Sequence, residues 1–408
     1  MLVRDTRFYV LVMERISLAV YLSPFYQKLA AFTQGPRWRL KVLGVCVVCV
    51  LLFQFPELQF LYHYAVAHTE PNNTYATFVQ QVANPWINHS TEANSHESKM
   101  VFRLTVPLLA RLLHLNVFGV LGLQAILGLA MLWALLTLIE RITQDRLTAS
   151  LLVLGTCFTY YGGAFLHDIY CLFDAFGYAV LVLMLLSRRP LVLYALSLAG
   201  CFLDERVLVA SLLVVLWHSM RVAAEAVPTV RRPTISWAAA AVVAGWFTYG
   251  ALRIWLTASY GLPTNGGAIG LGALRISLQR EVVALGFITS IESYWLVVIL
   301  ALVVLVKQRQ WLLGLAVVGA CLPVFASAFL VHDITRSLAY CFPVVLIALV
   351  VLAHYFTLDA LRQLALVIVV FAVLLPNYFY QFGIYYSESI FEKVFRFWML
   401  HNATGLAK

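Results

Sequence analysis

Long apolar runs recur along the whole chain, and short polar loops separate them. A membrane-spanning helix needs about 20 apolar residues to cross roughly 30 Å of hydrocarbon, so the pattern predicts an all-α, polytopic membrane protein with about 11 spans. Some of these spans are short, and amphipathic stretches beside them predict interfacial helices. The predicted membrane helices, in chain order, cover residues 42–61, 117–139, 151–166, 173–186, 191–203, 207–218, 236–257, 294–306, 311–331, 338–356 and 364–379.

The basic residues between the apolar runs set the orientation of the predicted spans. They gather in every second loop, and cytoplasmic loops of membrane proteins carry an excess of Lys and Arg. This pattern places the N-terminus in the cytoplasm and the C-terminus outside, in what we expect to be an inner (plasma) membrane. The chain is then a single transmembrane domain, 1–408. Residues 1–36 form a cytoplasmic interfacial segment, 65–116 and 260–292 are the two outer loops, and 382–408 form an outer C-terminal tail.

Residues 189–221 decide whether this alternation holds, because the charged run Asp204-Glu205-Arg206 interrupts their apolar sequence. A single span would centre these charges in the bilayer and put the next basic loop outside. A hairpin of two short helices, 191–203 and 207–218, keeps both flanking basic loops inside, and we favour it. Each arm is roughly 20 Å long, which is short of a full crossing. The turn would therefore lie below the outer surface, in a protein-lined recess.

Composition excludes several classes of protein. Hydrophobic residues make up 62% of the chain and charged residues 12%, which is outside the range of soluble globular proteins. The formal charge of +9 lies in short loops rather than in a basic stripe, so we expect no nucleic-acid partner. The seven cysteines all fall in or beside apolar runs, and we expect neither a disulfide framework nor a metal knuckle from them.

Three charged clusters interrupt the most hydrophobic parts of the chain. A charge at bilayer depth is costly unless it faces water, a cavity or a partner. The predicted topology puts all three clusters on the outer side, where we expect them to line a common recess. The clusters are His167-Asp168, Asp204-Glu205-Arg206, and His332-Asp333 with Arg336.

Each cluster has a structural interpretation beside the functional one. His167 and Asp168 could cap a helix at the water interface, and Arg206 could neutralise a neighbouring carboxylate. Asp333 and Arg336 have the spacing of a helical ion pair. In the functional interpretation Asp168 is a base or a metal ligand, and Arg336 binds phosphate through its planar, two-pronged donor group. The His-Asp pairs could also hold a divalent ion, Mg or Mn.

The layout of the chain resembles the GT-C superfamily, integral-membrane glycosyltransferases that use polyprenyl-phosphate sugars. The features that carry the resemblance are a long first outer loop, acidic span ends, short paired helices and an outer arginine near the C-terminus. The resemblance covers the whole chain and rests on architecture. It implies transfer of a sugar from a polyprenyl-phosphate donor within the membrane lipid to a glycan or protein acceptor on the non-cytoplasmic face, in cell-envelope glycan biosynthesis.

Members of this family usually place a catalytic acid, often Asp, in the first outer loop just after span one. That loop contains no Asp here, and the nearest match is Glu70. By resemblance, Arg336 binds the donor phosphate and Asp168 supplies the second acidic position. We therefore expect Glu70 or Asp168 to act as the general base. The full predicted site has Glu70, Asp168 and Glu205 as catalytic residues and His167, Asp204, Arg206, His332, Asp333, Arg336 and Arg103 as substrate-binding residues.

Two other classes of function compete with this hypothesis. A transporter or lipid flippase would use Asp204-Glu205-Arg206 as a proton or ion relay. Transporters usually show broken spans at corresponding positions of two halves, and only one such broken pair is evident in the sequence. A non-catalytic scaffold subunit is the third possibility, but a scaffold has no need for polar clusters this deep in the membrane.

Overall fold

The computed structural model describes residues 18–67, 73–89, 100–220, 236–262, 280–330, 333–375, 378–380, 384–386 and 389–403. Almost all of these residues are helical. The helices are α2 (Leu18–Phe32), α3 (Trp38–Phe53), α4 (Leu58–Tyr62), η1 (His63–Ala67), α5 (Asn73–Ala83), α7 (Thr105–Leu112), α8 (Val117–Thr143), α9 (Arg146–Thr156), α10 (Tyr160–His167), α11 (Asp174–Leu186), α12 (Pro190–Cys201), α13 (Glu205–Ser219), α14 (Trp237–Tyr260), α16 (Arg280–Ile291), η2 (Glu292–Tyr294), α17 (Trp295–Lys307), α18 (Trp311–Phe329), α19 (Ile334–Ala339), α20 (Pro343–Tyr355), α21 (Leu358–Leu374) and α22 (Ile390–Ala403).

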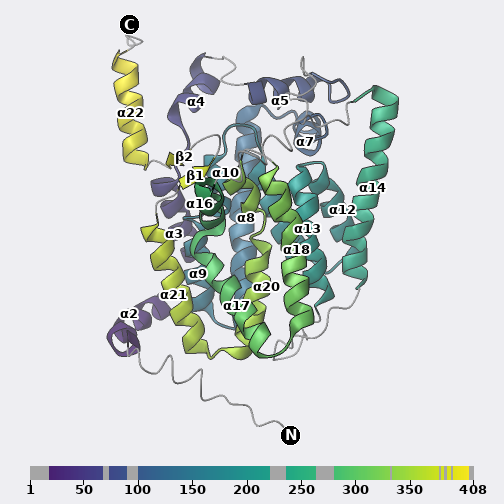
Figure 1. Ribbon diagram of the computed structural model, residues 1–408. Coiled ribbons are helices and arrows are strands. Elements are labelled where there is room, and N and C mark those ends of the chain that lie inside the picture. Colours follow the sequence, from purple (N-terminus) through teal and green to yellow (C-terminus); the bar gives the residue numbers. More distant parts are fainter. Residues whose placement is uncertain are drawn as a thin grey trace.

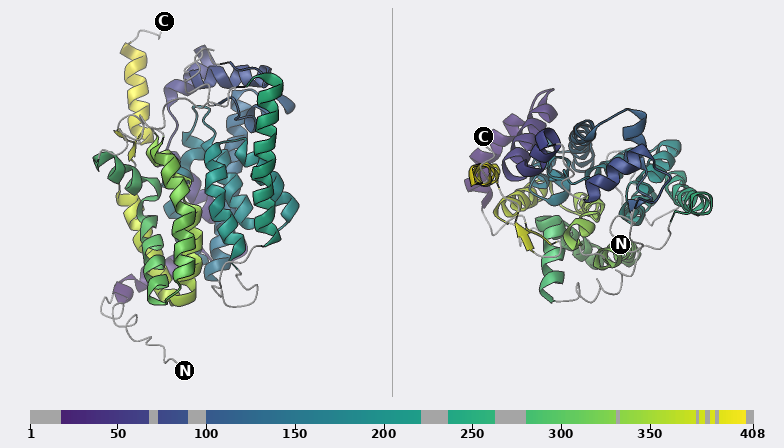
Figure 2. Two further views of the ribbon diagram at one scale, coloured as in Figure 1. Left: turned by 45° about the vertical axis from the view of Figure 1, so that its right-hand side comes forward. Right: turned by 90° about the horizontal axis from the view of Figure 1, so that it is seen from above.

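The long helices form one bundle whose two ends differ (Figure 1). Helix α2 lies at one end, the end at which α8 connects to α9 and α17 connects to α18. The opposite end is covered by α5 and α7, which lie across the tops of the long helices. Helix α22 stands at the periphery of this second end, as the view from above shows (Figure 2). The three charged clusters predicted to meet lie toward this second end, away from α2.

The described helices support a helical membrane protein, as predicted. Four of them are long and apolar enough to cross a bilayer, and the number rises to six if two sharply bent helix pairs each count as one span. The prediction of about 11 spans is not confirmed by this measure and stays a prediction, as do the orientation of the termini and the kind of membrane. The four long spans are Val117–Thr143, Trp237–Tyr260, Val283–Lys307 and Trp311–Phe329.

Several predicted spans differ in detail from the observed helices. The first bends by 94° between α3 and α4, and the third bends by 60° between α9 and α10. The eighth was predicted to begin at residue 294, after an outer loop, but its helix extends back to Val283. The predicted short hairpin corresponds to α12 and α13, which pack against each other and break at Asp204.

A small β-hairpin follows the last long helix and was missed in the all-α prediction. Strand β1 (Tyr378–Tyr380) pairs antiparallel with β2 (Ile384–Tyr386). Both strands consist of aromatic and β-branched residues, which favour extended backbone.

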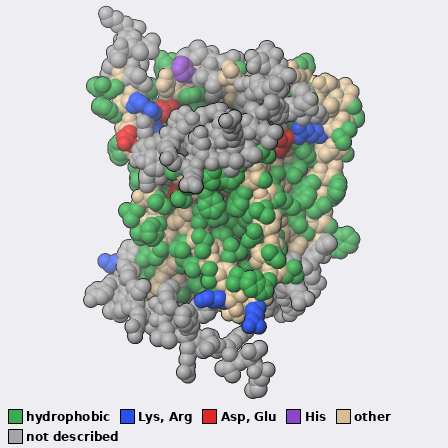
Figure 3. Space-filling view, viewed as in Figure 1, with side chains coloured by type: hydrophobic (Ala, Val, Ile, Leu, Met, Phe, Trp, Pro, Cys, Tyr) green, Lys and Arg blue, Asp and Glu red, His purple; other side chains and the backbone are tan. Residues whose placement is uncertain are grey.

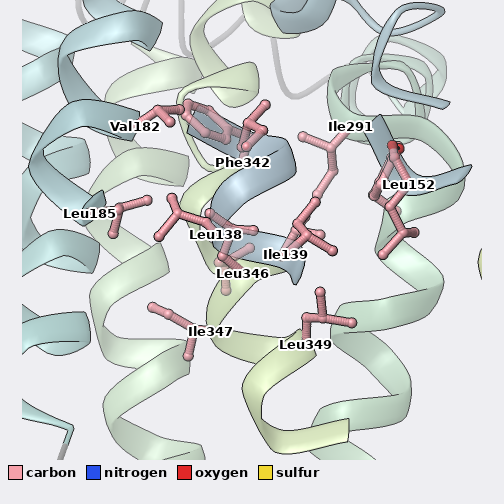
Figure 4. Packing of buried hydrophobic residues seen from close by; sticks show 14 of the residues in the cluster. Leu138, Ile139, Leu152, Val182, Leu185, Ile291, Phe342, Leu346, Ile347 and Leu349 are labelled. Carbon is pink, nitrogen blue, oxygen red and sulfur yellow. The ribbon is translucent and has the colours of Figure 1, made fainter. Parts of the chain in front are cut away.

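The core of the bundle is built around α20. Every residue from Pro343 to Leu352 is buried, which is expected of a helix that is apolar on all sides. Figure 4 shows side chains of α20 packed among those of α8, α9 and α11, with Phe342 and Ile291 in the same layer. This apolar core supports the charged end of the bundle from below.

The outer helices leave large apolar side chains uncovered. Leu312, Leu315, Val318 and Leu322 are all exposed and recur every three or four residues along α18, so they form one face of that helix. Figure 3 shows hydrophobic side chains across the middle of one face of the molecule, with charged side chains toward its upper and lower margins. A soluble protein rarely exposes apolar surface on this scale, whereas lipid chains would cover it.

An ion pair between Asp145 and Arg362 connects the start of α9 to α21, at the end of the bundle where α2 lies. Asp145 begins α9 by accepting the N–H of Thr148 at 2.9 Å, and Arg362 donates to the two Asp145 carboxylate oxygens at 3.0 and 2.8 Å. Burial alone would raise the pKa of Asp145, but hydrogen bonds from Arg362 and Thr148 outweigh it and hold the pKa below its ordinary value of 3.8. The pair therefore stabilises the ionised carboxylate.

Replacing Asp145 with asparagine should lower the free energy of unfolding by about 1–2 kcal/mol at pH 7, because the helix cap remains while the charge that holds Arg362 is lost. A depressed folded-state pKa contributes stability above the unfolded value and loses it in acid. The difference between native protein and D145N should therefore shrink as the pH falls below about 4. This difference in the free energy of unfolding can be measured by titrating the protein with SDS in mixed micelles while monitoring circular dichroism. Asp359, an exposed neighbour of Arg362, provides the control: D359N should change stability by less than about 0.5 kcal/mol.

Candidate functional site

Asp174 is the centre of a buried polar network at the covered end of the bundle. Its side chain is 0% exposed and accepts contacts from three other elements. Oδ1 accepts from Arg206 Nη2 at 2.9 Å and from the Tyr340 hydroxyl at 3.0 Å. Oδ2 lies 3.2 Å from the Tyr160 hydroxyl, which donates to it, and 3.0 Å from Arg336 Nε. One carboxylate thus joins α10, α13 and the α19 segment.

The local backbone structure around Asp174 favours a carboxylate at this position. Asp174 is the first residue of α11, where the positive end of the helix dipole favours a carboxylate. The preceding residue, Phe173, has a left-handed backbone with φ of 62°, which turns the chain sharply into the helix. Gly177 lies one turn further along, and a Cβ there would come within 2.7 Å of the Tyr340 hydroxyl. The glycine therefore leaves room for Tyr340 to reach Asp174.

The turn between α12 and α13 supplies a second buried carboxylate. Asp204 caps α13, and its Oδ1 accepts the backbone N–H and the side-chain Nε of Arg206 at 2.8 and 2.9 Å. Its Oδ2 lies 2.9 Å from Arg103 Nη2. Arg103 is held there because the next helix, α7, is anchored to the same turn: the Thr105 hydroxyl donates to the carbonyl of Ala199 at 2.7 Å. A chain of ion pairs thus runs through this turn, from Arg103 to Asp204 to Arg206 to Asp174.

Arg336 enters the network from α19, a helix of six residues in which every residue is buried. Besides Asp174, it contacts Asp333 at 3.1 Å, at the helical spacing that the sequence predicted. The Tyr178 hydroxyl donates to the backbone carbonyl of Arg336 at 3.1 Å and so fixes α19 against α11. The ion pair expected from the structural interpretation is therefore present, and the phosphate-binding role of Arg336 stays a prediction.

Asp168 lies just beyond the end of α10, next to Asp174. Its Oδ2 accepts the backbone N–H of Asp174 at 3.1 Å, and its backbone carbonyl accepts from Gln124 Nε2 at 2.8 Å. The residue is 1% exposed. Burial, together with repulsion by the Asp174 carboxylate, raises the pKa of Asp168 to about 7. A carboxyl group with such a pKa can exchange its proton near neutral pH, which is what a general base requires.

Besides Arg336 Nε, which lies within ion-pair distance of Asp174, four buried atoms of this network have no hydrogen-bond partner among the described residues. Buried polar groups are nearly always paired, so unpaired ones indicate water or a ligand that completes them. Two are guanidinium nitrogens, which donate, and two are carboxylate oxygens, which accept when ionised. They are Arg103 Nη1, Arg336 Nη1, Asp168 Oδ1 and Asp333 Oδ1.

The charges of the network nearly balance. Four carboxylates, including that of Asp168, face three guanidinium groups. If all seven are ionised, one negative charge is in excess, and the excess disappears when Asp168 holds a proton. This balance explains how so many charges can be buried together.

Not every predicted residue joins the network. Glu205 points away from it and pairs with Arg253 of α14, with 59% of its side chain exposed. His167 packs its ring against Tyr160 of α10. Arg103 joins the network from the segment that precedes α7, which begins at Thr105. Glu70 and His332 lie outside the described residues.

Asp174 and its two tyrosines were missed as site residues. The predicted site residues came from dense charged clusters, whereas Asp174 stands alone in an apolar run. A usable signal was present, because an isolated acid inside a predicted span implies a buried partner. Tyr160 and Tyr340 carried no comparable signal, since aromatic residues are frequent throughout the chain.

The predicted divalent metal finds little support in these contacts. No group of three or more His, Cys, Asp or Glu side chains in the described part of the chain is arranged to hold a metal ion. Asp174, Asp204 and Asp333 are each engaged by arginine, and the unpaired carboxylate oxygens of the described network are Asp168 Oδ1 and Asp333 Oδ1, which belong to two different segments. These residues do not form a ligand set for Mg or Mn, and no step proposed below is assigned to a metal.

Comparisons with known proteins gave no relative from which a function could be taken. No protein-family model matches the chain. No curated protein and no solved structure matches it either.

Proposed function

We propose that the protein is a membrane glycosyltransferase that takes its sugar from a polyprenyl-phosphate donor and transfers it at the covered end of the bundle. One observation carries the proposal: Arg103 and Arg336 each keep a buried, unpaired guanidinium nitrogen in the same network as Asp168, whose carboxyl oxygen is also unpaired. Guanidinium donors suit a phosphate, and a carboxylate suits the proton of a hydroxyl group. The uncovered apolar faces of the bundle suit the lipid chain.

The reaction would proceed by simple displacement. The acceptor hydroxyl oxygen bonds to the anomeric carbon of the sugar, and the bond from that carbon to the phosphate oxygen breaks. The bonding electrons leave with the polyprenyl phosphate, whose charge Arg336 stabilises through Nη1. The hydroxyl proton passes to Asp168. Asp174 touches no substrate in this scheme and positions Arg336 instead. Glu205 has no role in it, and the choice between Asp168 and Glu70 as the base stays a prediction.

The transporter hypothesis required Asp204-Glu205-Arg206 to relay protons or ions. In the structure Asp204 forms ion pairs with two arginines and caps α13, and Glu205 pairs with Arg253 of α14. A relay group must give up its partners during each cycle, and Asp204 would have to leave two buried arginines to do so. These contacts favour a fixed structural role for this turn and therefore support the transferase proposal over the relay.

The phosphate-binding role of Arg336 can be tested with farnesyl phosphate and its uncharged counterpart farnesol. We expect farnesyl phosphate to raise the unfolding temperature of the detergent-purified protein in a saturable way, and farnesol to have little effect. R336K keeps the charge but loses the planar donor group, so its affinity for farnesyl phosphate should fall about tenfold. The matched control is R253K, at an arginine paired with Glu205 outside the network, where affinity should stay within about twofold. Equal stabilisation by the two lipids, or native affinity in R336K, would contradict the assignment.

A further inference from the structure

A second buried acid lies in the bundle, away from the arginine network. Glu292 belongs to the short 3-10 turn η2, between α16 and α17, within the candidate span Val283–Lys307. Its backbone is left-handed, with φ of 48°, a conformation that residues other than Gly, Asn and Asp rarely adopt. The residue is 6% exposed. The span is therefore broken at a carboxyl group that the fold keeps inside.

Glu292 has no compensating partner among the described residues. Oε2 is buried without a hydrogen bond, and no ion pair involves the residue. Among the described titratable side chains, it acts electrostatically on the phenols of Tyr161 and Tyr294, which are uncharged at neutral pH. Tyr294 already donates to the carbonyl of Leu152.

The hydroxyl groups beside Glu292 in the chain are also engaged elsewhere. Ser290 donates to the carbonyl of Phe287 at 2.7 Å, and Ser293 donates to that of Ile368 at 2.9 Å. Thr289 bonds the hydroxyl of Thr335 on α19 at 2.8 Å. None of these groups makes its hydrogen bond to the carboxyl group, so the pattern differs from that around Asp174, whose carboxylate is contacted by two arginines and two tyrosine hydroxyls.

Burying an ionised carboxylate without a partner costs more than most proteins can tolerate, and such a group takes up a proton instead. We infer that the helix break at Glu292 is a proton-binding site, separate from the arginine network, in which the carboxyl group is held as the neutral acid. The ligand is a proton, bound within a span rather than at the surface. Nothing in this site depends on the glycosyl-transfer proposal.

Dicyclohexylcarbodiimide is a suitable probe, because this apolar reagent reacts with protonated carboxyl groups. The acid proton moves to a reagent nitrogen while the carboxyl oxygen bonds to its central carbon, and the adduct rearranges to a stable N-acylurea. We expect the Glu292 peptide of the full-length protein to gain the mass of one intact reagent at neutral pH. Its labelling should be at least about tenfold faster than that of Glu140, which is paired with Arg39 and Arg146.

A second measurement does not depend on reagent access. The infrared spectrum of the native protein minus that of E292Q should show the carbonyl band of one protonated carboxylic acid at pH 7. Because glutamine matches the neutral acid in shape and charge, E292Q should keep its half-life against heating within about twofold. D145N, which loses a paired carboxylate, should shorten that half-life severalfold.

Either labelling of Glu292 or the difference band supports the proposal. Absence of both would overturn it. Protection of Glu292 from the reagent by sodium but not by choline would also overturn it, because the group would then be an ionised ligand of a monovalent cation.

Discussion

Replacing Asp174 with alanine is expected to destabilise the folded protein by about 3–5 kcal/mol, the largest effect of any single change in this chain. The carboxylate is completely buried and holds Arg206 and Arg336 together with two tyrosine hydroxyls. Removing it leaves two guanidinium groups buried close together with one charge fewer between them. Breaking a buried pair in this way costs more than the pair itself contributes, because the remaining charge cannot return to water.

The measurement is the yield of monodisperse protein from detergent extracts, together with its unfolding temperature. D333N is the matched control, since Asp333 touches only Arg336 in this network and is 14% exposed at its side chain. It should cost clearly less than D174A, because Arg336 keeps Asp174 as a charged partner when Asp333 is neutralised. If D174A and D333N behaved alike, Asp174 would not be the centre of the network.

Replacing Asp168 with asparagine is expected to lower the rate of sugar transfer by a factor of about 10²–10⁴, the range attributed to a general base. The asparagine side chain has nearly the same shape and can still accept the N–H of Asp174 through its amide oxygen, so folding should be preserved. Affinity for farnesyl phosphate should stay within about twofold of native, because Asp168 does not touch Arg336. The assay is release of polyprenyl phosphate from a panel of polyprenyl-phosphate sugars in the presence of acceptor membranes.

The pH profile distinguishes a base from a merely structural residue. With a pKa of about 7 for Asp168, the native rate should rise tenfold per pH unit below that value and level off above it. The residual rate of D168N should lack this step. E205Q is the control, because Glu205 was predicted as catalytic but faces Arg253, and its rate should stay within about threefold. Loss of activity in E205Q with native activity in D168N would reverse the two assignments.

The sequence identified much of this site through local signals. The break at Asp204, the acid at the end of α10 and the arginine of α19 were all visible as charges in apolar surroundings, and a charge there needs a partner wherever the helix lies. Their roles were less visible. Asp204 was predicted to bind substrate, yet it is engaged by Arg103 and Arg206, and this depends on how α7 meets the α12–α13 turn.

For the fold, too, some features could be predicted from the sequence and others depended on tertiary contacts. Hydropathy located most of the long helices within a few residues, because burial in lipid acts on each segment separately. It did not locate the bends after α3 and α9, nor the backward extension of the eighth span into α16. A bend is set by what the two halves pack against. The Gln54 amide shows this at the end of α3, where it donates to the carbonyls of Cys157 and Thr159 at the α9–α10 bend.

By itself the sequence determined that this chain is a helical membrane protein with acids and arginines at the ends of its helices, because hydropathy and charge act residue by residue. Only the tertiary structure decided that Asp174 holds these charges together, that Glu205 lies apart from them, and that Glu292 has no described partner. Those outcomes depend on contacts between segments as far as 166 residues apart, as between Tyr340 and Asp174. A pattern read along one helix contains no information about which other helix its polar face will meet.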